Sequence, residues 1–456
     1  MQIKTIRPLF LLLIAPAIME AQPILRRDQI PVLDAKLRGQ VVDSIASEFV
    51  RLYVDADTGK MIAAHIRDRA RAHAYDQLTD PRAFSDALTQ DLRAINGDKH
   101  LNVGFNPNAH WDRPGKGGIV DDTGVVQHNS PEDEERARRD HWGLGRADIL
   151  PGNVGYMKVN GFEGSRSALD LTSAALKYLE GTDAMIFDLR GMGGGDGDQS
   201  NFLISHFTGP DSLATLRVSN RSSGKSWVRY TKASIPGKRR ADIPVFILTD
   251  QGTASAGEDF AFVLQQLRRA RTVGDRTAGA GHNNDFVDAG HGFGVSISYT
   301  RVADSRTGKE WERVGVQPDI KVDPRDALAA AQVAALDTLQ KLAKDPEWAR
   351  VVGVAKMTVL AQWRPVAIAP QTLASYTGTY AGGRVVALEN GALVFRRVAA
   401  RPPRPLLPVD DSTFVLTDIS VSFRRGANGA MEMVQHLPDG PFVLPREGDV
   451  PAQLGR

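Results

Sequence analysis

Two short segments carry residue types suited to nucleophilic catalysis. The first, PVFILTDQGTASAGEDF, runs from an apolar stretch through a glycine-containing turn into a helix expected to begin near Ala256. Ser255 stands at this junction, where unpaired backbone N–H groups and the positive end of the helix dipole stabilise negative charge. A serine before a helix is also an ordinary N-cap. The position therefore suits either a nucleophilic hydroxyl or a structural cap.

The second segment, AMIFDLRGMGGGDGD, places three glycines after an expected strand. Gly193, Gly194 and Gly195 allow the backbone to approach a bound group closely and to aim an amide N–H at it, which suits an oxyanion hole. The segment lacks the Lys-Ser/Thr pair of a P-loop and does not meet the dinucleotide-binding pattern. Because both segments follow strands expected in one parallel sheet, their strand ends should converge on one crevice.

Several elements must position these segments. Apolar residues at helical spacing over residues 33–97 predict a small helical bundle, with Asp34 and Asp80 as N-caps. Residues 98–150 form a β-rich connecting segment that ends in a charged run, PEDEERARRD, expected to be a solvated loop or helix face. Strands and helices alternate over residues 152–330, which predicts βαβ units and a largely parallel sheet.

The last part of the chain has a different pattern. Asn390-Gly391 between two apolar runs predicts a β-hairpin with a type I′ turn, and residues 365–456 are expected to form a small antiparallel β domain. Pro365 and Pro370 predict a linker near residues 345–370. The expected organisation is a signal peptide, a helical N-terminal domain, a connecting segment, an α/β core and a β domain, with bounds at 1–21, 22–97, 98–150, 151–345 and 365–456.

Composition excludes some classes of function. The chain has 456 residues, no cysteine and a formal net charge of +2. The absence of cysteine excludes disulfides, thiolate catalysis and Cys-based zinc sites, and the near-zero charge gives no basis for nucleic-acid binding. Lys4 and Arg7 before the apolar stretch Pro8–Ile18 resemble a secretory signal, although a disordered apolar N-terminus is the alternative. No later apolar run is long enough to span a bilayer, so we expect a periplasmic or secreted protein.

Four motifs occur in an order that resembles a known family. These are the DLR-x-x-x-GG turn, T-x-S-A-x-E (Thr253–Glu258), VGDRTAG (Val273–Gly279) and W-E-x-x-GV-x-PD (Trp311–Asp319). Together with helices that end in GDKHL, they are similar to the tail-specific, or C-terminal-processing, serine peptidases. The resemblance covers roughly residues 33–330 and is to the branch that includes tricorn protease and the interphotoreceptor retinoid-binding protein. It implies a crotonase-like (ClpP-like) α/β core.

The resemblance also implies site residues. One branch of the family uses a lysine in a GKG segment, but Ala280 stands at that position and no lysine occurs from Arg239 to Gly308. The other branch uses a histidine base held by an acid, which implies His100 as base and Glu312 as its carboxylate partner. The nucleophile is then Ser255. The implied oxyanion hole consists of the amides of Ala256 and of Gly193 or Gly194.

Some features depart from the family pattern. Lys99 precedes the histidine where the tricorn-like pattern has a serine, and His282 and His291 are rival bases. No segment clearly resembles the peptide-binding PDZ domain of the processing branch. No cofactor is expected. No metal site is expected either, because H-E-x-x-H is absent and Gly195–Asp198 lacks the spacing of a calcium loop.

The resulting prediction is an exported serine-type peptidase that hydrolyses peptides or unfolded polypeptides through an acyl-enzyme on Ser255. A neutral imidazole makes a serine nucleophilic, and a carboxylate stabilises the imidazolium that forms. One alternative is a non-catalytic protein that binds hydrophobic ligands or peptides on the same scaffold, and another is a small-molecule esterase or amidase. The sequence leaves an oligomer possible and does not give the cleavage specificity.

Overall fold

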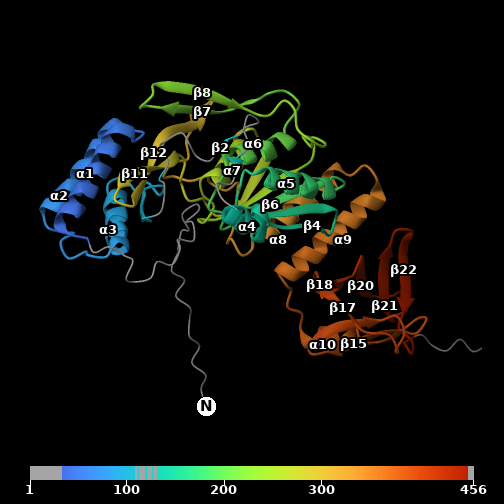
Figure 1. The fold of residues 1–456 in the computed structure, drawn as a ribbon. Helices are drawn as coiled ribbons and strands as arrows, with labels where there is room; N and C mark the ends of the chain where they lie inside the picture. Colours follow the sequence, from blue (N-terminus) through green and yellow to red (C-terminus); the bar gives the residue numbers. More distant parts are fainter. Residues whose placement is uncertain (1–32, 108–110, 112–118, 121–125, 128–130, 450–456) are drawn as a thin grey trace, which may run out of the picture.

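A computed structural model describes most of the chain as a mixed α/β protein with helices at one end and β-sheets at the other (Figure 1). It describes residues 33–107, 111, 119–120, 126–127 and 131–449. The signal peptide predicted at residues 1–21 lies outside the described residues. In this part of the chain, no helix has the length and apolar character needed to cross a membrane.

Three helices form the N-terminal region: α1 (Ala35–Leu52), α2 (Ala56–Arg71) and α3 (Pro81–Arg93). The predicted caps are confirmed. The Asp34 carboxylate accepts a hydrogen bond from Leu37 N at 2.7 Å, and the Asp80 carboxylate accepts from the amides of residues 82 and 83, both at 2.9 Å. These side chains satisfy N–H groups that a helix leaves unpaired in its first turn.

The N-terminal helices pack on an antiparallel sheet rather than forming a core of their own. The sheet has the order β1-β12-β7-β8, and β11 also pairs with β12. Its strands are β1 (Asn102–Phe105), β7 (Ala214–Asn220), β8 (Lys225–Tyr230), β11 (Asn283–Gly290) and β12 (Phe293–Asp304). One apolar cluster contains Phe49 and Phe84 from the helices together with Phe293 and Val295 from β12. Residues more than two hundred positions apart in the sequence therefore share one core.

A six-stranded sheet forms the centre of the molecule, in the order β13-β10-β9-β6-β5-β4. Its strands are β4 (Leu144–Leu150), β5 (Val154–Val159), β6 (Ala184–Asp188), β9 (Val245–Thr249), β10 (Ala270–Gly274) and β13 (Ile320–Lys321). All neighbouring pairs are parallel except β4 with β5. The predicted parallel sheet is thus confirmed, and its central strands β6 and β9 are buried at every residue.

Helices cover both faces of this sheet, which makes a three-layer arrangement. On one face, α5 (Arg166–Tyr178), α6 (Gly197–His206) and α7 (Ala256–Gln266) pack against Met185 and Phe187 of β6. On the other, α8 (Ala327–Leu342) and α9 (Pro346–Trp363) pack against Ile186 of the same strand. The alternation of β6 side chains between two apolar clusters explains why this strand is a continuous apolar run.

The predicted linker near residues 345–370 is wrong for most of its length. Asp345 caps α9 by accepting a hydrogen bond from Glu347 N at 3.1 Å, and Pro346 occupies the first helical position, where a missing N–H does no harm. The helix ends at Trp363, and only the short stretch 364–369 connects it to the next element. Proline therefore starts a helix here rather than breaking one.

The charged run before the core is partly helical. Helix α4 (Pro131–Arg139) contains most of PEDEERARRD, and the short 3-10 helix η2 (His141–Gly143) follows it. Two short strands, β2 (Ile119–Val120) and β3 (Val126–Gln127), pair with each other before α4.

The C-terminal region contains helix α10 (Pro370–Ser375) and two antiparallel sheets around one apolar core. The first sheet consists of β14 (Gly378–Tyr380), β15 (Arg384–Glu389), β16 (Ala392–Arg396) and β17 (Arg404–Pro405). The second consists of β18 (Leu407–Pro408), β19 (Thr413–Leu416), β20 (Ile419–Arg425), β21 (Met431–Leu437) and β22 (Gly440–Pro445). Asn390 and Gly391 have φ angles of 51° and 80° between β15 and β16, which confirms the predicted hairpin.

Candidate active site

Ser255 lies between β9 and α7 in an unusual backbone conformation. Its φ is 49° and its ψ is −120°, a region that residues with a Cβ rarely adopt. The residue is partly exposed, whereas Ala254 and Ala256 on either side are buried. A strained residue persists only where its surroundings hold it, and such residues concentrate at functional sites. The turn therefore presents the Ser255 side chain while burying its neighbours.

Hydrogen bonds fasten this turn to the glycine-rich turn after β6. Ala254 N donates to Met192 O at 2.9 Å, and Thr253 Oγ1 donates to Leu189 O at 2.8 Å. The two segments that the sequence analysis singled out are thus neighbours at the carboxyl ends of adjacent parallel strands, as the topology rule predicts.

Gly194 touches the nucleophile turn directly. Its φ is 121°, and a Cβ at this position would lie 2.7 Å from Ser255 Cβ and 3.2 Å from Ala256 N. Only a glycine permits this approach. Within the described residues, the amides of Gly193, Gly194 and Ala256 donate no recorded hydrogen bond. Two of the predicted oxyanion-hole residues, Gly194 and Ala256, therefore lie beside Ser255 with N–H groups that have no recorded partner among the described residues.

Glu258 connects the Ser255 backbone to the segment after β10. Its carboxylate accepts four hydrogen bonds: from Ser255 N at 3.1 Å, Gly279 N and Ala280 N at 2.7 Å, and Thr277 Oγ1 at 2.5 Å. Burial raises the pKa of Glu258 to about 7, although the four donors oppose this change. Glu258 was not predicted as part of the site, although it stands in the T-x-S-A-x-E motif.

The same segment continues to Glu312. Gly281 N and His282 N donate to Glu312 Oε2 at 2.6 and 3.1 Å. Since Ala280 N is bonded to Glu258, one short stretch of backbone links the carboxylate beside Ser255 to the carboxylate predicted as the acid. These bonds bring the sequence-distant motifs together.

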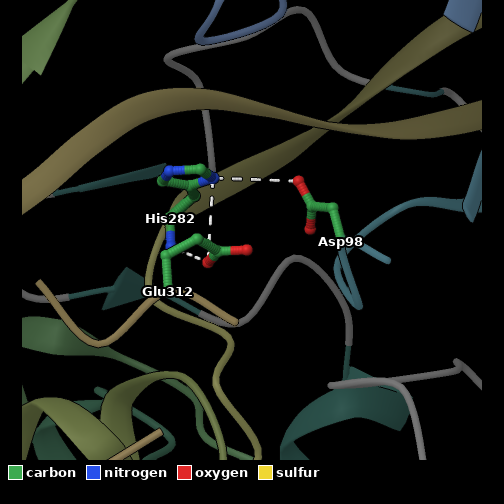
Figure 2. A group of neighbouring side chains, drawn as sticks. All are labelled: Asp98, His282 and Glu312. Atoms are coloured by element: carbon green, nitrogen blue, oxygen red, sulfur yellow. Dashed lines mark hydrogen bonds and ion pairs between the residues drawn. The ribbon is translucent and has the colours of Figure 1, made fainter. Parts of the chain in front are cut away.

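Three ionisable side chains meet beyond this link (Figure 2). The Nδ1 atom of His282 lies 3.7 Å from Glu312 Oε2 and 3.8 Å from Asp98 Oδ2. One donor atom from each of the three residues lies within 4.8 Å of those of the other two. The side chains of Asp98, His282 and Glu312 are 0%, 10% and 8% exposed. Little water therefore separates the charges of this group.

His100 adjoins the group through Asp98. Its Nδ1 is 3.9 Å from Asp98 Oδ1, and its backbone N–H donates to the same oxygen at 2.9 Å. The side chain is 9% exposed, and neither ring nitrogen has a hydrogen-bond partner among the described residues. We call Asp98, His100, His282 and Glu312 the imidazole cluster.

The two carboxylates of the imidazole cluster have opposite pKa shifts. Burial disfavours the charge on Asp98, but His282 and His100 outweigh this and hold the pKa of the Asp98 carboxyl at about 2. Burial raises the pKa of Glu312, with Asp98 adding to the effect and His282 opposing it. Burial also lowers the pKa of His100, despite the nearby Asp98. These shifts favour the anionic form of Asp98 and the neutral form of His100.

The side chain of Lys99 does not join the imidazole cluster, unlike those of Asp98 and His100 on either side of it. Its Nζ donates to Ala278 O at 2.5 Å, in the segment that Glu258 also holds. Burial lowers the pKa of Lys99, while the charge of Glu258 raises it. The connection between α3 and β1 therefore contributes Asp98 and His100 to the imidazole cluster and Lys99 to the segment beside Ser255.

The structure brings some of the predicted residues together and not others. Ser255 lies against Gly194 and Ala256, whereas the imidazole in contact with Glu312 is His282 rather than His100. For the described residues, no recorded hydrogen bond or ion pair joins either imidazole to Ser255. His291 is exposed in the turn between β11 and β12.

Asp98 is the member of the cluster that the sequence analysis missed. Its signal was present, because it stands two residues before His100 in the GDKHL motif.

Comparison with known proteins finds a family match over the central region. Residues 153–322 match the model of peptidase family S41. The chain is 30% identical over 179 residues to a carboxyl-terminal-processing protease of Synechocystis, which covers 39% of this chain and 40% of that protein. It is 25% identical over 190 residues to the carboxy-terminal processing protease CtpB of Bacillus subtilis, covering 41% and 38%. The chain thus spans less than half the length of these relatives.

Solved structures show more distant similarity. The photosystem II D1 C-terminal processing protease is 17% identical, with a TM-score of 0.41, and the match covers 64% of this chain and 94% of that one. The tricorn protease is 11% identical, with a TM-score of 0.42, and the match covers 67% and 37%.

The three-layer core, with its serine at a strand-to-helix turn, is of the kind found in serine-type hydrolases. Residues 153–322, which contain both Ser255 and Glu312, match the model of peptidase family S41, and part of the chain is similar to carboxyl-terminal-processing proteases.

Proposed function

We propose that this protein is a serine-type peptidase that cleaves peptides or unfolded polypeptides through an acyl-enzyme on Ser255. The observation that carries the proposal is the contact between Ser255, with a φ of 49°, and Gly194, where a Cβ would lie 2.7 Å from Ser255 Cβ. This turn is part of the segment that matches peptidase family S41. The names of the relatives support a polypeptide substrate, because they are processing proteases.

In the proposed reaction, Ser255 Oγ attacks the scissile carbonyl carbon and its proton passes to an imidazole. The amides of Ala256 and of Gly193 or Gly194 donate to the oxyanion that forms, and each such donor is worth about 3 kcal/mol of the barrier. The imidazolium then protonates the leaving amine. Water attacks the acyl-enzyme in the same way and releases the second product.

The base of the proposed relay is His100, which the family resemblance implies, with Glu312 as the acid. A second candidate is His282, because its Nδ1 lies 3.7 Å from Glu312 Oε2. In a relay of this kind, one ring nitrogen faces the carboxylate and the other faces the serine. The ring of His282 faces the Glu312 carboxylate, as this relay requires, whereas the ring of His100 is near Asp98.

The proposal extends to the setting of the enzyme. We propose a crotonase-like core, export to the periplasm or the outside of the cell, and cleavage without a dedicated peptide-binding PDZ domain. Export rests on the signal-like residues 1–21 alone.

A fluorophosphonate probe tests the proposed nucleophile. We expect it to label the wild-type protein covalently and not to label Ser255→Ala. Ser222→Ala, which changes an exposed serine, is the matched control and should label normally. Failure of the wild-type protein to label would instead support a non-catalytic binding protein. A panel of peptide and ester substrates then separates peptidase from esterase, since turnover of esters alone would contradict the peptidase proposal.

Two histidine variants test the base. Loss of the base should lower kcat by about 10⁴-fold while leaving the fold intact, because the oxyanion hole alone retains only part of the rate enhancement. We expect this loss in His100→Gln. If His282→Gln shows it and His100→Gln does not, the second candidate is the base.

A further inference from the structure

The imidazole cluster contains more polar atoms than its hydrogen bonds use. Both ring nitrogens of His100, Nδ1 of His282 and Oε1 of Glu312 are buried, and none has a hydrogen-bond partner in the described ranges. A buried polar atom without a partner costs about 1–3 kcal/mol. Four such atoms within one cluster of side chains point to a ligand that several of them bind at once.

We propose that the imidazole cluster binds one divalent transition-metal ion, and that zinc is the ion that fits its donors best. Three donors, one imidazole and two carboxylates, lie within 4.8 Å of one another, and the second imidazole, His100, lies beside Asp98. Zinc accepts imidazole and carboxylate donors in four-coordinate sites, with water completing the set where the protein supplies three. Imidazole donors disfavour magnesium and calcium, which prefer oxygen ligands alone.

The spacing of the donors fits a tetrahedral ion. Zinc bonds of about 2.1 Å require donor atoms about 3.4 Å apart. His282 Nδ1 lies 3.7 Å from Glu312 Oε2 and 3.8 Å from Asp98 Oδ2, and the three donors fall within 4.8 Å of one another (Figure 2). Modest side-chain shifts therefore bring all three to bonding distance.

His100 lies beside these three donors and supplies independent support. Its side chain is more than nine-tenths buried, neither ring nitrogen has a partner in the described chain, and Nδ1 lies 3.9 Å from Asp98 Oδ1. An imidazole in such surroundings is uncommon unless it binds something, because buried polar groups are nearly always paired.

Other hydrogen bonds orient the two carboxylates. Tyr53 OH donates to Asp98 Oδ2 at 2.9 Å, and the amides of residues 281 and 282 donate to Glu312 Oε2. Metal sites commonly use such bonds to fix their ligands. The ligands come from three distant parts of the chain, which explains why motif spacing predicted no metal site.

The ion would control the enzyme, an extension that rests on the proposed function. A lone pair of His100 or His282 that binds a metal cannot accept the Ser255 proton. The metal-bound protein should therefore be inactive, and a chelator should restore the activity.

Titration of Zn²⁺ into the full-length Ser255→Ala protein, followed by calorimetry, tests binding without any need for turnover. We expect one ion per chain and at least 100-fold weaker binding in His282→Gln and Glu312→Gln. His291→Gln changes an exposed histidine outside the cluster and should bind as tightly as the parent. No binding, or equal binding in all three variants, would overturn the proposal.

The spectrum of Co²⁺ provides a test that needs no cluster variant. Co²⁺ bound to the Ser255→Ala protein should give the intense visible bands of a tetrahedral site, and the weak bands of an octahedral ion would overturn the proposal. Fluorophosphonate labelling of metal-free wild-type protein separates the two claims. Metal binding without labelling leaves the metal site standing and removes the proposed function, while labelling without metal binding does the reverse.

Discussion

The nucleophile turn, residues 250–258, and the imidazole cluster lie at the two ends of one hydrogen-bonded stretch of backbone, yet they are built differently. In the turn, Glu258 uses both carboxylate oxygens to accept four hydrogen bonds, and Thr253 and Ala254 are bonded to the glycine-rich turn. In the cluster, both ring nitrogens of His100 lack partners among the described residues.

This difference separates two requirements of catalysis. Stabilising an oxyanion requires donors that are fixed before the reaction begins, and a saturated hydrogen-bond network provides that rigidity. Accepting and returning a proton requires a group that exchanges partners. The turn, whose hydrogen-bonding groups are paired, suits the stabilisation of an oxyanion. The imidazole cluster, which has unpaired ring nitrogens, suits the binding and release of a proton or of an ion.

Among variants that leave the proposed nucleophile and base in place, the largest effect is expected from changing the rigid turn. Gly194→Ala places a methyl group 2.7 Å from Ser255 Cβ at a φ of 121°, so the backbone that we propose as the oxyanion hole must move. We expect kcat/KM to fall about 100- to 1000-fold, measured as the rate of fluorophosphonate labelling and of peptide hydrolysis. Gly197→Ala, where a Cβ would meet nothing within 4 Å, should retain activity. Equal rates in both variants would contradict a role for Gly194.

The second effect is a pH dependence of stability at Glu258. The pKa of Glu258 is raised by burial from 4.5 to about 7, so the folded state binds more protons than the unfolded state between these values. The free energy of unfolding should therefore fall by about 3 kcal/mol from this group as the pH rises from 4.5 to 7.

Urea unfolding at pH 5 and pH 8 measures this effect. The fall should be absent in Glu258→Gln and present in Glu347→Gln, which changes an exposed glutamate. If the free energy of unfolding changed with pH in the same way in the wild-type and Glu258→Gln proteins, the four donors would be keeping Glu258 ionised.

A smaller effect is expected from removing a hydrogen bond that holds Asp98 in the imidazole cluster. Tyr53→Phe removes the hydroxyl that donates to Asp98 and accepts from Asn96. Loss of these buried bonds should lower the free energy of unfolding by about 1–2 kcal/mol, measured by urea denaturation. Tyr178→Phe, at a 59% exposed position, should change it little. An unchanged stability in Tyr53→Phe would mean that Asp98 does not depend on this donor.

The smallest effect is expected at Lys99. In Lys99→Met, the bond from Nζ to Ala278 O is lost while the apolar stem remains. We expect kcat/KM to fall less than about 10-fold, since one partly exposed hydrogen bond is worth about 1 kcal/mol. Lys60→Met, on the surface of α2, is the control. A loss near 1000-fold would instead make Lys99 the base and would end the assignment of that role to the imidazole cluster.

Local patterns predicted the elements well. Asp34, Asp80 and the Asn390-Gly391 turn have the conformations that their residue types favour, because caps and turns depend on neighbours in the sequence. Residues 345–370 show the limit of this approach. Pro365 and Pro370 predicted a linker there, but Pro370 begins helix α10 and only residues 364–369 connect it to α9. The apolar residues of α9 gain their partners only once β6 and α8 are in place.

Only those parts of the site that follow directly from the order of the strands could be predicted. Ser255 and Gly194 follow adjacent parallel strands, so their meeting is a consequence of topology. The contact of His282 with Asp98 and Glu312 depends on how the segment after β10 crosses to the N-terminal helices. No local pattern encodes that crossing, and the pairing of Glu312 with His100 was implied by the family resemblance alone.

The shared core of the N-terminal helices and β12 limits how this chain can be engineered. The rings of Phe84 and Phe293 meet edge to face at 5.8 Å, so neither segment has a complete apolar interior without the other. Deletion of residues 33–97 would expose the apolar face of a sheet, and a graft of the helices onto a relative would need residues 283–304 as well. These two stretches of the sequence must therefore be exchanged together or not at all.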